Sequence, residues 1–301
     1  MSMDPQVRAY LDRVATSGRP ANADLDPLQA RAQNEALAPE AAGPVLPVSR
    51  VVDDAVAGVA VRIYDPDPVR TLPTLVYLHG GGWVIGSLDT HDSACRALAR
   101  RTPCRVVSVA YRLAPEHRFP TAVDDSWAVL SAIAREASAP VAAGGDSAGG
   151  NLAAVLALRA RNTGLPLALQ LLIYPVTDSD QTTRSYRAYG DGHGMTQRDM
   201  EWFFHHYVGD GDRRHPEIAP LRAASLAGVA PAHVQVAELD VLHDEGVAYA
   251  ERLRRERVPV TLTEMTGMVH GYIRQAGLFD RTRDAWDDCA SALNTAFFGP
   301  R

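Results

Sequence analysis

From about residue 59 onward, short runs of apolar, β-forming residues alternate with longer stretches of helical character. Several short runs are apolar throughout rather than at every second position, as strands buried on both faces are. The expected strands are residues 59–65, 74–80, 105–111, 140–145, 168–174, 233–239 and 259–265. The expected helices lie at about 91–101, 121–137, 147–161, 243–257 and 277–297. This alternation predicts an α/β fold in which helices flank a mostly parallel central sheet.

Two regions do not follow this alternation. Residues 1 to about 45 indicate one or two helices followed by a linker rich in proline and alanine. Residues from about 178 to 220 are polar, apart from one aromatic helix with the sequence RDMEWFFHHYV. We expect the two regions to pack together as a helical cap over one edge of the sheet, within a single domain that spans residues 1–301.

The composition excludes several classes of function. The chain has 301 residues, of which 46% are hydrophobic, and a formal net charge of −6. This length is enough for a large core, and the mild, mixed charge gives no sign of a nucleic-acid partner. The three widely spaced cysteines favour a reducing compartment over a disulfide or zinc framework. Because the sequence shows neither a secretory signal nor an apolar run of ~18 residues, we expect a cytoplasmic protein without stable membrane association.

The clearest candidate for chemistry is the stretch VAAGGDSAGGNLAAVLAL at residues 141–158. Gly145, Ser147 and Gly149 match the pattern G-x-S-x-G between an expected strand and an expected helix. In that context the pattern indicates a nucleophile elbow, a tight turn that exposes the serine hydroxyl at the edge of the sheet. The alternative is a glycine-rich turn in which the serine only caps the helix.

A second glycine-rich stretch, HGGGW, begins at His79 directly after an expected strand. Consecutive glycines allow backbone N–H groups to approach a substrate oxygen, as in one half of an oxyanion hole, and the residue after the nucleophile, Ala148, supplies the other half. The alternatives are a flexible turn or a phosphate-binding loop, although neither common phosphate-loop pattern is present. His79 itself is better placed to orient the loop than to react.

A serine nucleophile needs a histidine base, and that base needs an orienting carboxylate. Of the ten histidines, His270 stands out because it lies in a glycine-flanked loop after the last expected strand. Asp240 follows the preceding strand directly, which gives the order Ser, acid, His expected of this fold. Asp244 and Glu245 fall in the first turn of the next helix, where acidic residues favour the helix dipole. We therefore choose Asp240 as the acid.

Together these motifs resemble the hormone-sensitive-lipase-like carboxylesterases of the α/β-hydrolase fold. The resemblance covers most of the chain from about residue 40 onward and rests on HGGGW, YRLAPEHRFPTAVDD, GGDSAGGNLA, ELDVLHDEG and MVHGY, in that order. It implies that Ser147 is the nucleophile, that Asp240 and His270 complete the triad, and that Gly81, Gly82 and Ala148 form the oxyanion hole. It also implies the helical cap, and members of the family often form homodimers.

The sequence therefore predicts a serine esterase for short- to medium-chain carboxylic esters, with a small-molecule ester as its partner and with neither cofactor nor metal. An amide, N-acyl or lactone hydrolase with the same triad remains open, since the fold alone does not separate these reactions. A small-molecule receptor is a further alternative, because the plant gibberellin receptor resembles this family without being an esterase. Its triad histidine is replaced, whereas His270 is present here. The adjacent His205 and His206 lack the spacing of paired metal ligands on a helix.

Overall fold

The computed structural model describes residues 3–299 and contains one eight-stranded sheet with the strand order β1-β2-β4-β3-β5-β6-β7-β8. The pairs β1–β2 and β2–β4 are antiparallel, and all other neighbouring strands are parallel. The predicted mostly parallel sheet is therefore confirmed. The strands are β1 (Arg50–Val56), β2 (Val59–Asp65), β3 (Thr74–Leu78), β4 (Arg105–Val109), β5 (Val141–Asp146), β6 (Gln170–Ile173), β7 (Ala232–Leu239) and β8 (Val260–Val269).

The strand that the sequence pattern missed is β1. It lies at the edge of the sheet, and most of its side chains are exposed or only partly buried, so it lacks the apolar run of the central strands. Ala57 and Gly58 connect it to β2, and both adopt a positive φ, of 51° and 81°. Two such residues make the tight hairpin turn whose twist matches that of the flanking strands.

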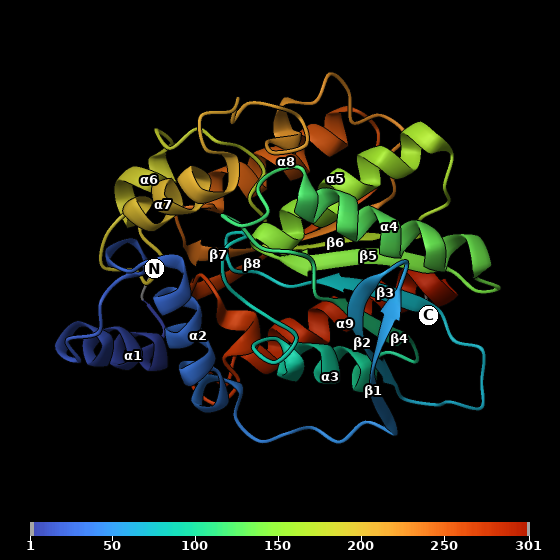
Figure 1. The fold of residues 1–301 in the computed structure, drawn as a ribbon, viewed down its shortest axis with the longest axis horizontal. Helices are drawn as coiled ribbons and strands as arrows, with labels where there is room; N and C mark the ends of the chain where they lie inside the picture. The colour runs from blue at the N-terminus through green and yellow to red at the C-terminus, as the bar shows by residue number, and fades with distance from the viewer. Residues whose placement is uncertain (1–2, 300–301) are drawn as a thin grey trace.

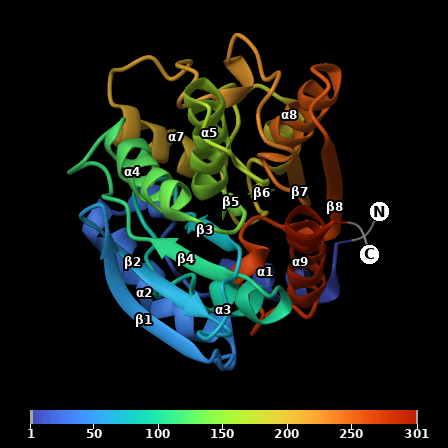
Figure 2. The same cartoon turned by 90° about the vertical axis from the view of Figure 1, so that its right-hand side faces the viewer.

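Helices cover both faces of the sheet, as predicted (Figures 1 and 2). One face carries α4, α5 and α8, and the other carries α3 and α9 (Figure 2). These helices are α3 (Asp92–Arg101), α4 (Thr121–Glu136), α5 (Ala148–Thr163), α8 (His243–Arg255) and α9 (Thr282–Phe298). The last helix was expected to begin at residue 277, but a short 3₁₀ turn, η3 (Tyr272–Arg274), and an irregular segment precede it.

The two regions outside the strand–helix alternation lie side by side, on the left of Figure 1. The first contains α1 (Pro5–Thr16), η1 (Asn22–Asp24) and α2 (Pro27–Ala42). The second contains α6 (Arg184–Tyr189), α7 (Gln197–Val208) and, at its end, η2 (Pro220–Arg222). The N–H of Ala23 donates to Asp199 at 3.2 Å, and Arg198 forms an ion pair with Asp24 at 2.6 Å. Within residues 3–299, no helix combines the length and the apolar character needed to cross a membrane.

Candidate active site

Ser147 lies in a sharp turn between the buried strand β5 and helix α5. Its φ of 56° and ψ of −120° are a strained combination for a residue with a side chain, as in a nucleophile elbow. A Cβ atom at either Gly145 or Gly149 would collide with the backbone carbonyl of Leu78 on β3. The glycines of the motif are therefore required by the close approach of the neighbouring strand, which explains the small residues around the serine.

Ser147, His270 and Asp240 form a continuous hydrogen-bonded line. The Nε2 atom of His270 lies 2.9 Å from Ser147 Oγ, and its Nδ1 atom lies 2.7 Å from Asp240 Oδ2. Asp240 follows β7, His270 follows β8, and both side chains are largely shielded from solvent. Since a carboxylate only accepts hydrogen bonds, Nδ1 carries the ring proton and Nε2 accepts from the serine hydroxyl. This is the arrangement in which the imidazole can remove the serine proton.

The two other acidic residues considered from the sequence have different partners. Asp244 accepts a hydrogen bond from the backbone of Ser185 at 2.9 Å. Glu245 accepts one from the backbone of Thr177 at 2.7 Å, and burial raises its pKa well above the ordinary value. Neither carboxylate contacts His270 among the described interactions. The structure thus places Asp240, and not its acidic neighbours, beside the histidine.

The loop after β3 holds the glycines expected to face a substrate oxygen. Gly81 and Gly82 have φ values of 122° and 58°, and the carbonyl of Gly81 accepts hydrogen bonds from Val84 and Ile85 within the loop. A Cβ at Gly81 would collide with the carbonyl of Ile85. In the part of the chain that the structure describes, the N–H groups of Gly81, Gly82 and Ala148 donate to no protein acceptor. These N–H groups are therefore available to an oxygen bound from outside.

A hydrogen-bond network that the sequence reading missed joins this loop to the elbow. Asp146, directly before Ser147, accepts hydrogen bonds from the Tyr77 hydroxyl at 2.8 Å and from the Gly80 N–H at 3.0 Å. Burial alone would raise the pKa of Asp146, but His91 and Tyr77 outweigh that effect and hold the pKa well below its usual range. The ionised Asp146 thus holds the glycine loop against the turn that contains Ser147. The only sequence signal was the acidic residue next to the serine.

His79 is part of the same loop and has a structural environment. Its Nδ1 atom lies 2.9 Å from the carbonyl of Gly80, and its ring stacks on Tyr111 with the centroids 4.3 Å apart. Burial lowers the pKa of His79 to about 3, so the ring is neutral at physiological pH. The neutral ring of His79 thus supports the backbone of its own loop.

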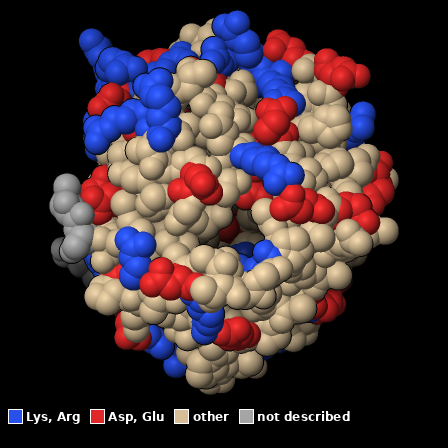
Figure 3. Space-filling view, turned by 90° about the vertical axis from the view of Figure 1, so that its left-hand side faces the viewer, with Lys and Arg blue, Asp and Glu red and all other residues tan. Residues whose placement is uncertain are grey.

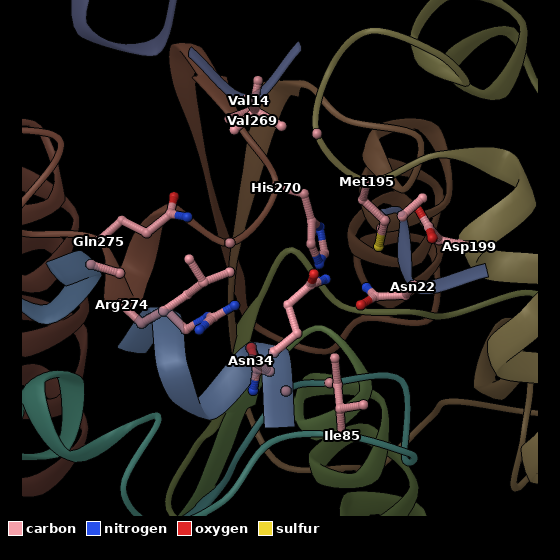
Figure 4. A pocket seen from close by; sticks show the side chains of 18 of the residues that line it. Val14, Asn22, Asn34, Ile85, Met195, Asp199, Val269, His270, Arg274 and Gln275 are labelled. Atoms are coloured by element: carbon pink, nitrogen blue, oxygen red, sulfur yellow. The ribbon is translucent and has the colours of Figure 1, made fainter. Parts of the chain in front are cut away.

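A cavity of about 500 Å³ lies over Ser147 and His270. Its walls come from the sheet edge and from both of the regions outside the alternation, including Asn34 of α2 and Asp199 of α7 (Figure 4). Figure 3 shows a hollow on the face of the molecule that carries these regions. Within residues 3–299, no group of three or more His, Cys, Asp or Glu side chains is arranged to bind a metal.

The replacement Gly81→Ala should lower kcat by about 10²–10³, the usual effect of losing one oxyanion donor. The new methyl group would collide with a backbone carbonyl, which cannot move without reshaping the loop. Steady-state kinetics on a p-nitrophenyl ester measure the loss. Gly164→Ala is the matched control, because Gly164 also has a positive φ but nothing lies near its missing Cβ. Equal losses in the two variants would mean that the loop geometry at Gly81 is not needed for turnover.

Comparisons with known proteins agree with this fold. A family model described as alpha/beta hydrolase fold matches residues 75–274. The carboxylic ester hydrolase LipN of Mycobacterium tuberculosis is 38% identical over 97% of this chain and 82% of its own length. An ethyl acetate hydrolase of Pseudomonas putida is also 38% identical, over 93% of this chain and 95% of its own. Among solved structures, an alpha/beta hydrolase from the metagenome of Lake Arreo, Spain, superimposes with a TM-score of 0.94 at 36% identity, covering 98% of both chains.

Proposed function

This chain belongs to the hormone-sensitive-lipase-like family of α/β hydrolases and is a carboxylic ester hydrolase, and from this premise we propose that Ser147, His270 and Asp240 are its catalytic triad. The observation that carries the proposal is the line of two hydrogen bonds, 2.7 and 2.9 Å long, that joins the three side chains at the wall of the cavity. We further propose that the N–H groups of Gly81, Gly82 and Ala148 form the oxyanion hole.

In this mechanism the Ser147 oxygen attacks the ester carbonyl carbon while its proton moves to Nε2 of His270. The carbonyl oxygen becomes negatively charged, and the proposed N–H donors stabilise that charge. The C–O bond to the alcohol then breaks, and His270 passes its proton to the departing oxygen. A water molecule, deprotonated by the same imidazole, then attacks the acyl carbon. The bond to Ser147 breaks, the carboxylic acid is released, and His270 returns the proton to the serine oxygen. Asp240 stabilises the imidazolium in both halves of the reaction.

We also propose that the chain is a single domain, residues 1–301, whose cap is formed by residues 1 to about 45 and about 178 to 220. The contact between Ala23 and Asp199 and the ion pair between Arg198 and Asp24 support a joint cap. Both regions contribute walls to the cavity over Ser147, which supports a role in substrate selection. All three cysteines are free and buried, as a protein of the reducing cytoplasm permits. We also propose that the protein forms a homodimer and that it has no nucleic-acid partner.

The enzyme should act on dissolved esters of short to medium acyl chains. Each methylene that the cavity buries improves binding by about 0.8 kcal/mol, so kcat/KM should rise with chain length until the cavity is filled and then fall. The relative that is named an ethyl acetate hydrolase supports this range. A series of p-nitrophenyl esters from acetate to palmitate measures the profile. We expect saturation kinetics on butyrate and hexanoate without a rise in rate at an interface, whereas activity confined to emulsified long-chain triglyceride would contradict the proposal.

A further inference from the structure

We propose that the preferred substrate carries, besides its ester group, a free ionised carboxylate, which Arg274 binds within the cavity. The inference rests on the proposed esterase function and extends it from a reaction to a class of substrate. The carboxylate belongs either to the acyl part, as in a monoester of a dicarboxylic acid, or to the alcohol part, as in the acyl ester of a hydroxy acid. Both sources present the same anion to the arginine.

Arg274 is held close to the reacting groups by a well-anchored turn. It lies in η3, shortly after His270, and its side chain extends into the same cavity (Figure 4). Two side chains of α9 donate to the backbone of this turn. Thr282 Oγ1 donates to the carbonyl of Tyr272 and Trp286 Nε1 to the carbonyl of Ile273, each at 2.8 Å. The position of the guanidinium therefore depends on its own side-chain rotamers and not on a mobile loop.

Arg274 is partly buried, and its guanidinium has no hydrogen-bond or ion-pair partner among the described residues. Most other partly buried arginines of the described chain are paired, and Arg19 is an exception. Arg31 binds Glu116 at 2.6 Å, and Arg62 binds Asp53 at 2.6 Å. Removing a cation from water is costly unless an acceptor replaces the lost hydration. The N–H groups of an unpaired arginine in the wall of a substrate cavity are thus free to donate to a bound substrate.

The carboxylates that line the cavity are already occupied. Asp146 accepts hydrogen bonds from the elbow network, Glu40 forms an ion pair with Arg13 at 3.1 Å, and Asp199 caps α7. The charge of Arg274 helps to keep the pKa of Asp146 low, but the two side chains form neither a hydrogen bond nor an ion pair in the structure described.

A second arginine of the cavity wall, Arg19, also has a side chain without a partner in the described part of the chain. Both basic and acidic atoms are visible at the hollow in Figure 3. With Arg13 neutralised by Glu40, the unpaired groups of the wall carry positive charge. The wall also contains the carboxyl groups of Asp146 and Asp199, so the preference for an anion rests on the free donors of Arg274 and Arg19 and not on the net charge of the cavity.

A carboxylate fits these donors better than other groups that an ester brings. The planar guanidinium presents parallel N–H groups that match the two oxygens of a carboxylate, and such charge-assisted pairs are about twice as strong as neutral hydrogen bonds. The amide side chains of Asn34 and Gln275 line the same cavity and are visible beside Arg274 in Figure 4. A neutral acyl chain would leave the guanidinium unpaired when it displaced water from the cavity.

The test compares charged esters with neutral esters of the same shape. The acyl arm pairs monoethyl succinate with ethyl levulinate, and the alcohol arm pairs 3-acetoxypropanoate with 4-acetoxy-2-butanone. In the wild type, kcat/KM for the charged member should exceed that for its neutral partner by about 10- to 100-fold in at least one arm, as a charge-assisted hydrogen bond allows. A preference in the acyl arm alone or in the alcohol arm alone supports the proposal and locates the carboxylate.

The replacement Arg274→Met should abolish this ratio, and Arg274→Lys should restore part of it. Because the ratio is taken within one preparation, it does not depend on the fraction of folded enzyme. The control is the double variant Arg13→Gln/Glu40→Gln, which removes a paired arginine from the same wall without a change in net charge. Because this pair has no contact with Arg274 among the described interactions, the variant should keep the ratio within about twofold.

Two results would overturn the inference while leaving the esterase function intact. One is a wild type that hydrolyses the neutral esters and shows no preference in either arm. The other is an Arg274→Met variant that loses activity equally on charged and neutral esters, which would mean that the arginine acts only through the elbow network. Failure of the proposed function gives a different result, since neither the neutral esters nor p-nitrophenyl butyrate would then be hydrolysed.

Discussion

Replacing Ser147 with alanine should abolish the acyl-enzyme and leave at most about 10³–10⁴ of acceleration over water, supplied by binding and the oxyanion hole. The loss is specific because the Ser147 hydroxyl is the group that lies 2.9 Å from Nε2 of His270. Alanine occupies a similar volume, so the elbow should keep its turn. Turnover of p-nitrophenyl butyrate measures the loss, and mass spectrometry after organophosphate treatment should find one label, on the wild type only and at Ser147.

Ser126→Ala is the matched control for this experiment. Ser126 is also a buried serine, but its hydroxyl donates to the carbonyl of Ala122 within α4 at 2.7 Å. Its removal should cost a modest part of the stability and leave kcat unchanged. A Ser147→Ala variant with turnover near that of the wild type, or a label on another serine, would remove Ser147 from the mechanism.

Asp240→Asn should lower kcat by on the order of 10⁴, the loss seen when a triad carboxylate becomes an amide. Asp240 Oδ2 accepts the proton of His270 Nδ1 at 2.7 Å, while Oδ1 accepts the N–H of Leu242 at 3.0 Å. Asparagine can keep the second bond with its oxygen, which then directs its NH₂ group toward the imidazole. The imidazole must in turn place its proton on Nε2, where it can no longer accept the proton of the serine.

Asp244→Asn is the control for the choice of acid, because Asp244 bonds the backbone of Ser185 and has no contact with His270 among the described interactions. It should cost far less than Asp240→Asn in the same assay. Circular dichroism and thermal unfolding establish that both variants are folded. If the larger loss were found for Asp244→Asn, the proposed triad would have the wrong acid.

The central strands were predictable from the sequence because they are buried on both faces and therefore apolar throughout. β5, for example, has no exposed residue and pairs with β3 and β6. The edge strand β1 was not predictable in this way, since its exposed side chains give it the polarity of a loop. The start of α9 was misplaced because Leu278 and Phe279 continue the apolar pattern of the helix into the irregular segment before it.

For the candidate site, the sequence was informative where a motif is local. Ser147, Asp240 and His270 each directly follow a strand, so the parallel sheet predicts that they meet at one edge. Contacts between segments that are far apart in the chain leave no recognisable pattern in the sequence. The hydrogen bond from Tyr77 to Asp146 is of this kind, and so is the unpaired state of Arg274, which depends on the partners of every other carboxylate in the cavity. These features required coordinates.

The joint cap also has a consequence for the order of events during synthesis. Ala23 and its hydrogen-bond partner Asp199 are separated by 176 positions in the chain. At roughly 5–20 residues per second, about 9–35 s pass on the ribosome between the two. During this time the first helices depend only on local interactions. For α2 these include the capping box formed by Asp26 and Gln29. The N–H of Asp4 bonds the carbonyl of Gly267, close to His270 in the chain, so the N-terminal segment docks among the last of the translated elements. The segments that form the turn at Ser147 are therefore synthesised well before the last segment that the N-terminal region contacts.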